Sequence, residues 1–82
     1  MAFRGVPYAR APIGSLRLRP PEPPLPWAGV LDATRFGDVA LQHPPPSVAL
    51  PALAIGERSE DCLTLNVFTP SPDGARRPVL VW

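Results

Sequence analysis

The side chains of this chain that could act as a nucleophile or a base are four serines, one histidine and one cysteine. A serine or cysteine nucleophile needs a base within hydrogen-bond reach, usually oriented by a third group. None of the serines, Ser15, Ser47, Ser59 and Ser71, stands in Gly-x-Ser-x-Gly, the tight turn that presents a serine nucleophile. His43 precedes three prolines, a setting typical of an exposed loop histidine. These residues predict no catalytic centre within the chain.

The chain also lacks the residues that usually form metal and cofactor sites. One cysteine, Cys62, and one histidine offer neither an internal disulfide nor the ligand cluster of a zinc site. The glycines form no loop of the kind that binds phosphate groups. We therefore expect no metal and no cofactor. Cys62 begins an apolar run, and we interpret it as a small buried apolar residue.

An acidic pair, Glu60 and Asp61, directly precedes that apolar run. In one interpretation the pair lies in a solvated loop. In the other it is partly buried and bridged to arginine, because a buried charge needs a partner. Arg17 and Arg58 are the candidate partners. The second interpretation makes the pair a structural lock and not a catalytic group.

A proline-rich stretch carries another short pattern. Residues 17–23, Arg-Leu-Arg-Pro-Pro-Glu-Pro, match Arg-x-x-Pro-x-x-Pro, which aromatic-lined grooves bind in the polyproline conformation. The match is weakly specific, since any arginine in a proline-rich stretch can produce it. The alternative is a rigid connector, and both interpretations stay open at this point.

Composition narrows the class of protein. The chain has 82 residues and 14 prolines, 45% of it is apolar, and its formal net charge is +1. It is too apolar for a typical disordered tail, yet a chain this short is marginal as an independent domain. It contains no basic block, no apolar run near the ~18 residues of a membrane span, and no visible signal peptide. We expect neither nucleic-acid nor membrane partners.

Three segments are predicted to be extended. Residues 2–9 form an apolar run that bends at Pro7. Residues 62–69 alternate apolar and polar side chains and end at Pro70. Residues 78–82 form a continuous apolar run, typical of a strand buried on both faces. That run has no terminator, so we expect the natural chain to continue.

Proline-rich segments and turns separate these runs. Prolines exclude a helix over residues 10–27, where we expect coil with polyproline character, and residues 43–59 form a second proline-rich loop. Turns are expected at residues 32–34, at 37–38 and at 73–74, the last joining two strands.

Residues 59–70, Ser-Glu-Asp-Cys-Leu-Thr-Leu-Asn-Val-Phe-Thr-Pro, resemble the Glu-Asp-Cys-Leu-x-Leu-Asn signature of type-B carboxylesterases, the cholinesterase-like branch of the α/β-hydrolases. Other runs resemble the family in the same order. They are Phe-Arg-Gly-Val-Pro-Tyr-Ala at 3–9, Pro-Ile-Gly-Ser-Leu-Arg-Leu at 12–18, the proline-rich run at 20–30 and Pro-Val-Leu-Val-Trp at 78–82. The resemblance covers nearly the whole chain.

The resemblance implies the α/β class. Residues 1–82 would be the N-terminal part of an α/β-hydrolase, with extended N-terminal strands, proline-rich loops and the first strands of the central sheet, incomplete as a domain and truncated before the oxyanion-hole loop. The full-length protein would be a serine hydrolase that cleaves small carboxylic esters by acyl transfer, without metal or cofactor. This chain alone would be inactive. The resemblance also implies a structural salt bridge between Arg17 and Glu60.

Two departures from the family pattern refine these expectations. The family often pairs the cysteine of Glu-Asp-Cys with an earlier cysteine, and the matching position here is Ala40. The disulfide would be absent and Cys62 free, which fits a reducing, cytoplasmic location. Residues 43–58 contain no Trp, Tyr or Phe side chain to bind a choline cation. A general esterase of microbial type is therefore favoured over a cholinesterase.

Three functions remain compatible with the sequence. The favoured one is the N-terminal fragment of a carboxylic-ester hydrolase. The others are a proline-rich segment bound by a polyproline-binding groove domain, and a truncated gene product without a function of its own. In the favoured interpretation the structural residues are Arg17, Glu60, Asp61 and Cys62.

Overall fold

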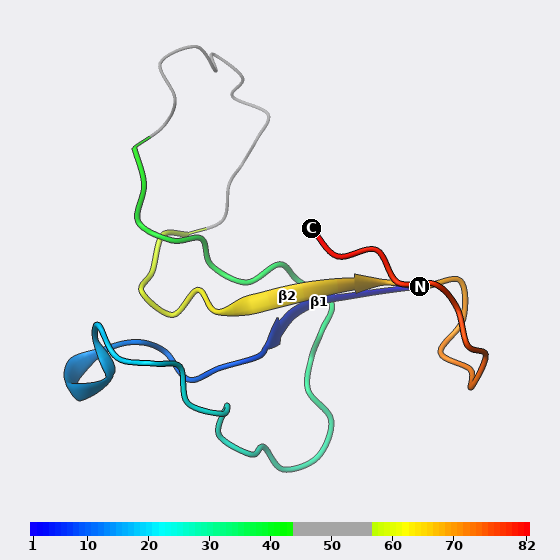
Figure 1. The fold of residues 1–82 in the computed structure, drawn as a ribbon, viewed down its shortest axis with the longest axis horizontal. Coiled ribbons are helices and arrows are strands. Elements are labelled where there is room, and N and C mark those ends of the chain that lie inside the picture. Colours follow the sequence, from blue (N-terminus) through cyan, green and yellow to red (C-terminus); the bar gives the residue numbers. More distant parts are fainter. Residues whose placement is uncertain (44–56) are drawn as a thin grey trace.

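The computed structural model describes residues 1–43 and 57–82. The chain forms strand β1 (Ala2–Pro7), a short 3-10 helix η1 (Gly14–Leu16) and strand β2 (Thr64–Phe68), joined by long irregular segments (Figure 1). Both strands lie inside runs that the sequence predicts to be extended. Most of the second proline-rich loop lies outside the described residues.

The two strands form one antiparallel sheet although they are far apart in the sequence. Ala2 lies opposite Phe68 and Pro7 lies opposite Thr64. Tyr8 extends the ladder, because its backbone N–H donates to the carbonyl oxygen of Leu63 at 3.1 Å. The sheet therefore ties the start of the chain to the acidic run that precedes β2.

A β-bulge interrupts the register in the middle of β1. Arg4 and Gly5 together oppose Asn66, and the N–H of Gly5 donates to the side-chain Oδ1 of Asn66 at 3.0 Å. The φ angle of Gly5 is 65°, and a Cβ at this position would lie 2.8 Å from the carbonyl oxygen of Arg35. Backbone conformation and space both require glycine here.

Residues 33–37, called here the crossing segment, pass β1 at this bulge. The N–H of Arg4 donates to the carbonyl oxygen of Ala33 at 2.8 Å. The Arg4 guanidinium donates to the carbonyl oxygen of Thr34 at 3.3 Å and lies 5.0 Å from the centroid of the Phe36 ring, a cation–π distance. Arg4 thus attaches the crossing segment to the sheet by its backbone and its side chain.

The prediction of a turn at residues 37–38 is wrong. Gly37 continues the crossing segment without a bend. A Cβ on Gly37 would lie 2.5 Å from Oγ1 of Thr64, closer than real Cβ atoms approach. Glycine is needed here because two segments approach closely. The sequence alone cannot distinguish such a glycine from one in a turn.

The turn predicted at residues 32–34 is present. Oδ1 of Asp32 accepts hydrogen bonds from the hydroxyl of Thr34 at 2.6 Å and from its backbone N–H at 3.1 Å. The side chain of an aspartate closes a turn in this way. The hydroxyl bond, followed by the backbone bond, lowers the pKa of Asp32 from its ordinary value.

The bend predicted at residues 73–74 is also present, but it joins no second strand. Asp73 accepts two hydrogen bonds from the guanidinium of Arg77, at 2.5 and 2.8 Å, and one from the N–H of Ala75 at 3.0 Å. The bonds from Arg77 are the main cause that lowers the pKa of Asp73 to about 2.

Residues 10–27 are irregular, as predicted, apart from η1. Leu18 follows η1 with a φ of 60°, a conformation that a leucine rarely adopts, and its side chain is 97% exposed. A polyproline helix needs φ near −75° at each residue. Leu18 therefore interrupts the polyproline conformation between Arg17 and the prolines that begin at Pro20.

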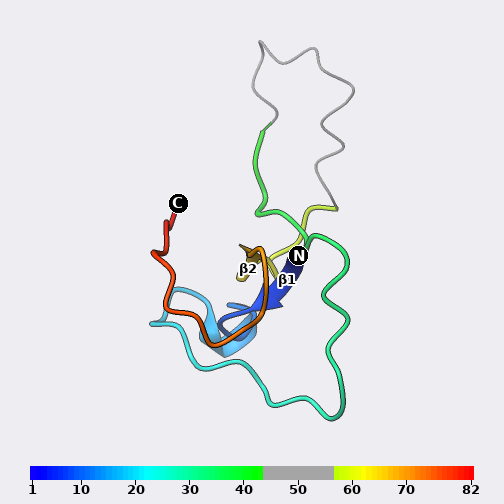
Figure 2. The ribbon, with the colours of Figure 1, turned by 90° about the vertical axis from the view of Figure 1, so that its right-hand side faces the viewer.

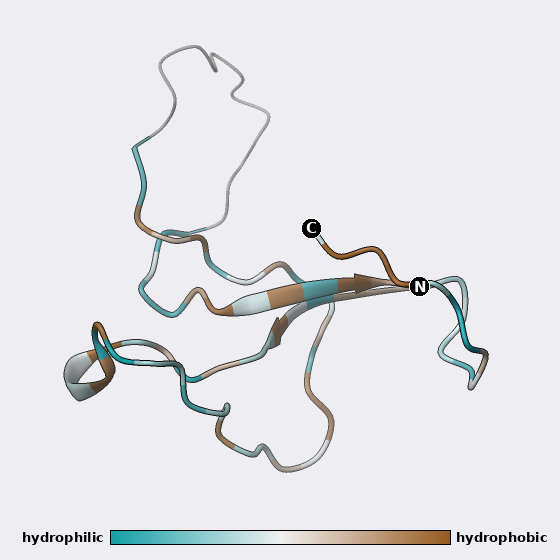
Figure 3. Cartoon of the chain, viewed as in Figure 1, coloured by the Kyte–Doolittle hydropathy of each residue, from teal (hydrophilic) through white to brown (hydrophobic). Residues whose placement is uncertain are grey.

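The prediction of a strand over residues 78–82 is wrong. These residues form no regular element, and Val79 to Trp82 are each at least 84% exposed. Figure 3 shows this terminal segment as a mostly apolar stretch. An apolar run becomes a strand only when a neighbouring strand pairs with its backbone, and no described segment does so.

The described residues contain almost no core. Ala9 is the one apolar residue among them that is buried. The chain exposes 7379 Å², whereas a folded monomer of this mass exposes about 4800 Å² by the usual scaling. Figure 2 shows loops that spread away from the sheet in several directions. The arrangement resembles part of a domain more than a complete one.

Candidate functional site

Val39 and Arg58, which lie on either side of the undescribed residues 44–56, form a short parallel bridge. The N–H of Val39 donates to the carbonyl oxygen of Glu57 at 2.9 Å, and the N–H of Ser59 donates to the carbonyl oxygen of Val39 at 3.0 Å. This bridge fixes the start of the acidic run, which continues through Glu60 towards β2.

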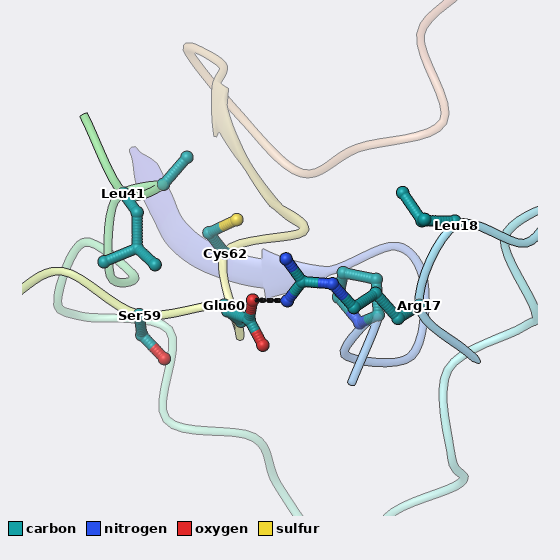
Figure 4. Close-up of a pocket in the computed structure, with 8 residues that line it drawn as sticks. Arg17, Leu18, Leu41, Ser59, Glu60 and Cys62 are labelled. Carbon is teal, nitrogen blue, oxygen red and sulfur yellow. Dashed lines mark hydrogen bonds and ion pairs between the residues drawn. The ribbon is translucent and has the colours of Figure 1, made fainter. Parts of the chain in front are cut away.

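Arg17 and Glu60 form an ion pair at this point, between Nη1 of the arginine and Oε1 of the glutamate. Helix η1 positions the arginine, whose backbone N–H donates to the carbonyl oxygen of Gly14 at 3.2 Å. Figure 4 shows the guanidinium facing the carboxylate, with Cys62 beside them. The contact expected between Arg17 and Glu60 is therefore present.

This pair is more exposed than a buried lock would be. The side chain of Arg17 is 63% exposed and that of Glu60 is 40% exposed. Water screens such a pair, so in this chain it contributes about 0.2–1 kcal/mol and not the several kcal/mol of a buried pair. The partial burial expected for the acidic pair is present at Glu60, which is half-buried, and absent at Asp61, which is exposed.

Asp61, the second residue of the acidic pair, and Arg58, the second candidate arginine, form no such contact within the described residues. Asp61 is exposed, and its N–H donates to the side-chain oxygen of Ser59 at 3.0 Å. Arg58, the second candidate partner, forms no ion pair with a described residue. The structure thus brings Arg17 to Glu60 alone, and Asp61 follows the solvated interpretation.

Cys62 and Ala40 line one surface pocket of about 340 Å³. Cys62 is free and half-buried, so the prediction that it is a buried residue is not met in this chain. The same pocket is lined by Arg17, Glu60 and apolar side chains that include Leu41 (Figure 4). The resemblance places the partner cysteine of Cys62 at position 40. Ala40, which occupies that position, lines the same pocket as Cys62.

Among the described residues, no hydrogen bond joins His43 to a serine or to Cys62. His43 is exposed at the edge of the described range, Ser15 is exposed, and Ser59 caps its own turn. Ser47 lies outside the described residues. Within residues 1–43 and 57–82 there is also no group of side chains that could hold a metal ion, and no helix that is long and apolar enough to cross a membrane.

Several contacts that hold this region were not found from the sequence. Arg10 forms an ion pair with Glu22 at 2.8 Å, and its N–H donates to the carbonyl oxygen of Glu22 at 3.0 Å. This clamp closes the segment that carries η1. The sequence signal that could have predicted this ion pair is an arginine and a glutamate on either side of a proline-rich segment. That arrangement is too common to be specific.

Comparison with known proteins covers the whole chain. Residues 1–82 match the profile of the Carboxylesterase family. The chain is 50% identical over 82 residues to phenmedipham hydrolase of Pseudarthrobacter oxydans, covering 98% of this chain and 17% of that protein. It is 42% identical over 80 residues to para-nitrobenzyl esterase of Bacillus subtilis (strain 168), covering 98% of this chain and 16% of that protein.

A mammalian relative gives the same picture. Liver carboxylesterase 1 of Mus musculus is 42% identical over 89 residues, covering 98% of this chain and 16% of that protein. The chain thus spans about a sixth of the length of the curated relatives that it matches. The family profile, the relatives and the acidic run that leads into β2 agree, and this chain belongs to the carboxylesterase family.

Proposed function

We propose that this chain forms the N-terminal part of a serine carboxylic-ester hydrolase with an α/β-hydrolase fold. The observation that carries the proposal is the match of the family over residues 1–82, together with relatives whose names describe ester hydrolases. In the complete protein a serine would attack the ester carbonyl, a histidine would move the proton, and backbone N–H groups would stabilise the oxyanion.

The residues of this chain have a structural role in that proposal. Arg17 attaches the proline-rich segment to Glu60, and Glu60 stands at the entrance to β2. Asp61 and Cys62 continue that entrance, so the four residues set the position from which β2 starts. The substrate is a small carboxylic ester, and no residue of this chain is assigned to its chemistry or to a cofactor.

The alternative of a polyproline ligand loses support in the structure. Its arginine, Arg17, is paired with Glu60, and Leu18 interrupts the required backbone conformation. A groove domain reads the arginine and the prolines from one continuous polyproline helix. The family match therefore keeps the esterase proposal as the preferred one.

A chimeric enzyme tests the proposal. This chain replaces the matching segment of phenmedipham hydrolase, and hydrolysis of p-nitrophenyl butyrate is measured. We expect the chimera to be active and the isolated chain to show no turnover, because none of its described residues forms a nucleophile–base pair. A soluble, folded chimera without esterase activity would contradict the proposal, as would turnover by the isolated chain that a serine substitution abolishes.

A further inference from the structure

Two contacts bring the ends of residues 10–22 together. The guanidinium of Arg10 pairs with the carboxylate of Glu22 at 2.8 Å, and the backbone N–H of Arg10 donates to the carbonyl oxygen of Glu22 at 3.0 Å. Figure 1 shows this segment leave the end of β1, turn at η1 and return towards its start. A compact surface segment of about 6–16 residues whose ends are close is an Ω-loop. Residues 10–22 are called here the clamped loop.

Arg17 lies within the clamped loop, between two of its turns. The N–H of Arg17 donates to the carbonyl oxygen of Gly14 at 3.2 Å. The N–H of Arg19 donates to the carbonyl oxygen of Leu16, also at 3.2 Å. Leu18, between the two arginines, has a φ of 60°, and a leucine keeps this conformation only where the surrounding contacts determine it. The direction of the Arg17 side chain therefore depends on the shape of the whole loop.

The sheet holds the first end of the clamped loop. The N–H of Tyr8, two residues before Arg10, donates to the carbonyl oxygen of Leu63 at 3.1 Å. Leu63 follows Glu60 in the run that leads into β2. The loop therefore starts at a point that is fixed to the same run that carries Glu60.

The returning end of the clamped loop depends on Arg10. Residues 23–31 form no hydrogen bond with any described residue, and the chain is next attached to the sheet at the crossing segment. If the contacts between Arg10 and Glu22 opened, Arg17 would lie in a much longer segment without a second attachment. Bringing a long free segment to one contact costs more entropy than bringing a short closed loop to it.

We propose that Arg10 and Glu22 position Arg17 for its contact with Glu60. Closing residues 10–22 removes conformational freedom from Arg17 before it pairs, so less entropy is lost when the guanidinium meets the carboxylate. The side chains of Arg10 and Glu22 are 41% and 48% exposed, so their ion pair contributes little stability by itself. Its main effect is on the position of Arg17. The proposal rests on contacts within this chain and does not require the proposed function.

Hydrogen exchange in the chimera with phenmedipham hydrolase tests the loop. Glu22→Gln keeps the side-chain size and the backbone carbonyl, and it removes the charge that Arg10 binds. We expect the backbone amides of Arg17 and Arg19 to exchange at least ~5-fold faster in this variant, because their turns open more often. The amide of Tyr8, which belongs to the sheet, should keep its rate. Unchanged rates at Arg17 and Arg19 would overturn the proposal, as would an equal acceleration at Tyr8.

Two further variants complete the exchange experiment. Arg19→Gln removes one charge from the same loop, and Arg19 forms no ion pair with a described residue. The amide of Arg17 should keep its rate in this control. The charge-swapped variant Arg10→Glu/Glu22→Arg restores an ion pair and should return the rate at Arg17 to within about twofold of the parent value. A control as fast as Glu22→Gln, or a swapped variant that stays as fast, would overturn the proposal.

A coupling measurement separates positioning from general stability. The double-mutant cycle of Arg17→Ala and Glu60→Ala is measured in the parent chimera and again with Glu22→Gln present. We expect Glu22→Gln to lower the coupling energy to less than about half and Arg19→Gln to leave it unchanged. Lower stability with unchanged coupling would show that Glu22 has a structural role only, and the proposal would be wrong. Absence of coupling in the parent would overturn it as well. Neither measurement needs esterase activity, so failure of the proposed function leaves both valid.

Discussion

The guanidinium of Arg17 meets the carboxylate of Glu60 across 43 positions of sequence. The contact joins the segment that follows η1 to the run that leads into β2, and it lies in a pocket whose other walls are mainly apolar. In this chain water reaches both side chains. Their energetic importance therefore depends on what covers the pocket in the complete domain.

We predict a measurable coupling between these two residues in the chimera. A double-mutant cycle of Arg17→Ala and Glu60→Ala is expected to give a coupling energy above about 1 kcal/mol, the upper limit for an exposed pair. We expect the rest of the chimera to cover the pocket, which would remove water from the pair and strengthen it. Chemical denaturation of the four proteins measures the coupling.

The control for that cycle is Arg19→Ala, which removes a neighbouring arginine that forms no ion pair with a described residue. It should change the free energy of unfolding by much less than Arg17→Ala. A coupling energy below about 0.2 kcal/mol would show that the pair contributes nothing to stability.

Two glycines with similar backbone conformations allow a second prediction. Gly5 has a φ of 65° and no room for a Cβ, whereas Gly29 has a φ of 72° and open space around it. In the chimera, Gly5→Ala should cost more than Gly29→Ala by about 1–3 kcal/mol, because only at Gly5 does a steric conflict add to the backbone strain. Thermal unfolding measures the difference, and equal costs would place Gly5 outside a tight contact.

The sequence predicted the extended runs of β1 and β2 because both show local apolar patterns that end at proline or a bend. It also predicted the turn at Asp32, where one side chain closes its own loop. The contact of Arg17 with Glu60 was expected from the family resemblance and not from spacing. Local chemistry and family resemblance thus account for most of what was predictable.

The features that sequence missed depend on segments that meet in space. The bulge needs Asn66 opposite Gly5, and the attachment of Arg4 needs Phe36 beside it. The predicted strand at residues 78–82 failed for the same reason, since pairing requires a neighbour that the described residues do not supply. Residue type alone did not indicate these partners.

A third prediction concerns the missing disulfide. Ala40→Cys should form a disulfide with Cys62, because the family resemblance pairs a cysteine at position 40 with Cys62 and both residues line one pocket. In the chain-entropy estimate, a disulfide that closes a loop of this size stabilises the folded protein by about 3 kcal/mol. Thiol titration and the Tm of the oxidised and reduced chimera measure the effect, with Ala40→Cys/Cys62→Ser as the control. Two titratable thiols that persist in the oxidised single variant would contradict the predicted proximity.

A fourth prediction concerns the isolated chain. With Ala9 as the one buried apolar residue described, burial cannot offset the ~1–2 kcal/mol that ordering costs at each residue. We expect calorimetry to show no cooperative thermal transition, and we expect aggregation at high concentration because the strand edges are open. A reversible two-state transition of a soluble monomer would contradict this prediction.

The last prediction uses the turn at Asp73, which is local and does not need the sheet. The bonds from Arg77 hold the pKa of Asp73 at about 2, whereas an unfolded aspartate titrates near ~3.9. Because the folded pKa is depressed, the stabilisation of the turn is complete above about pH 4 and is lost as the pH falls through about 2. Carbon NMR of the Asp73 carboxyl in this chain should give a midpoint near the lower value. Arg77→Gln should raise that midpoint, and Arg76→Gln, which removes the neighbouring charge without touching the bond, should raise it much less. A midpoint that does not change between native buffer and concentrated urea would show that the turn is not formed in solution.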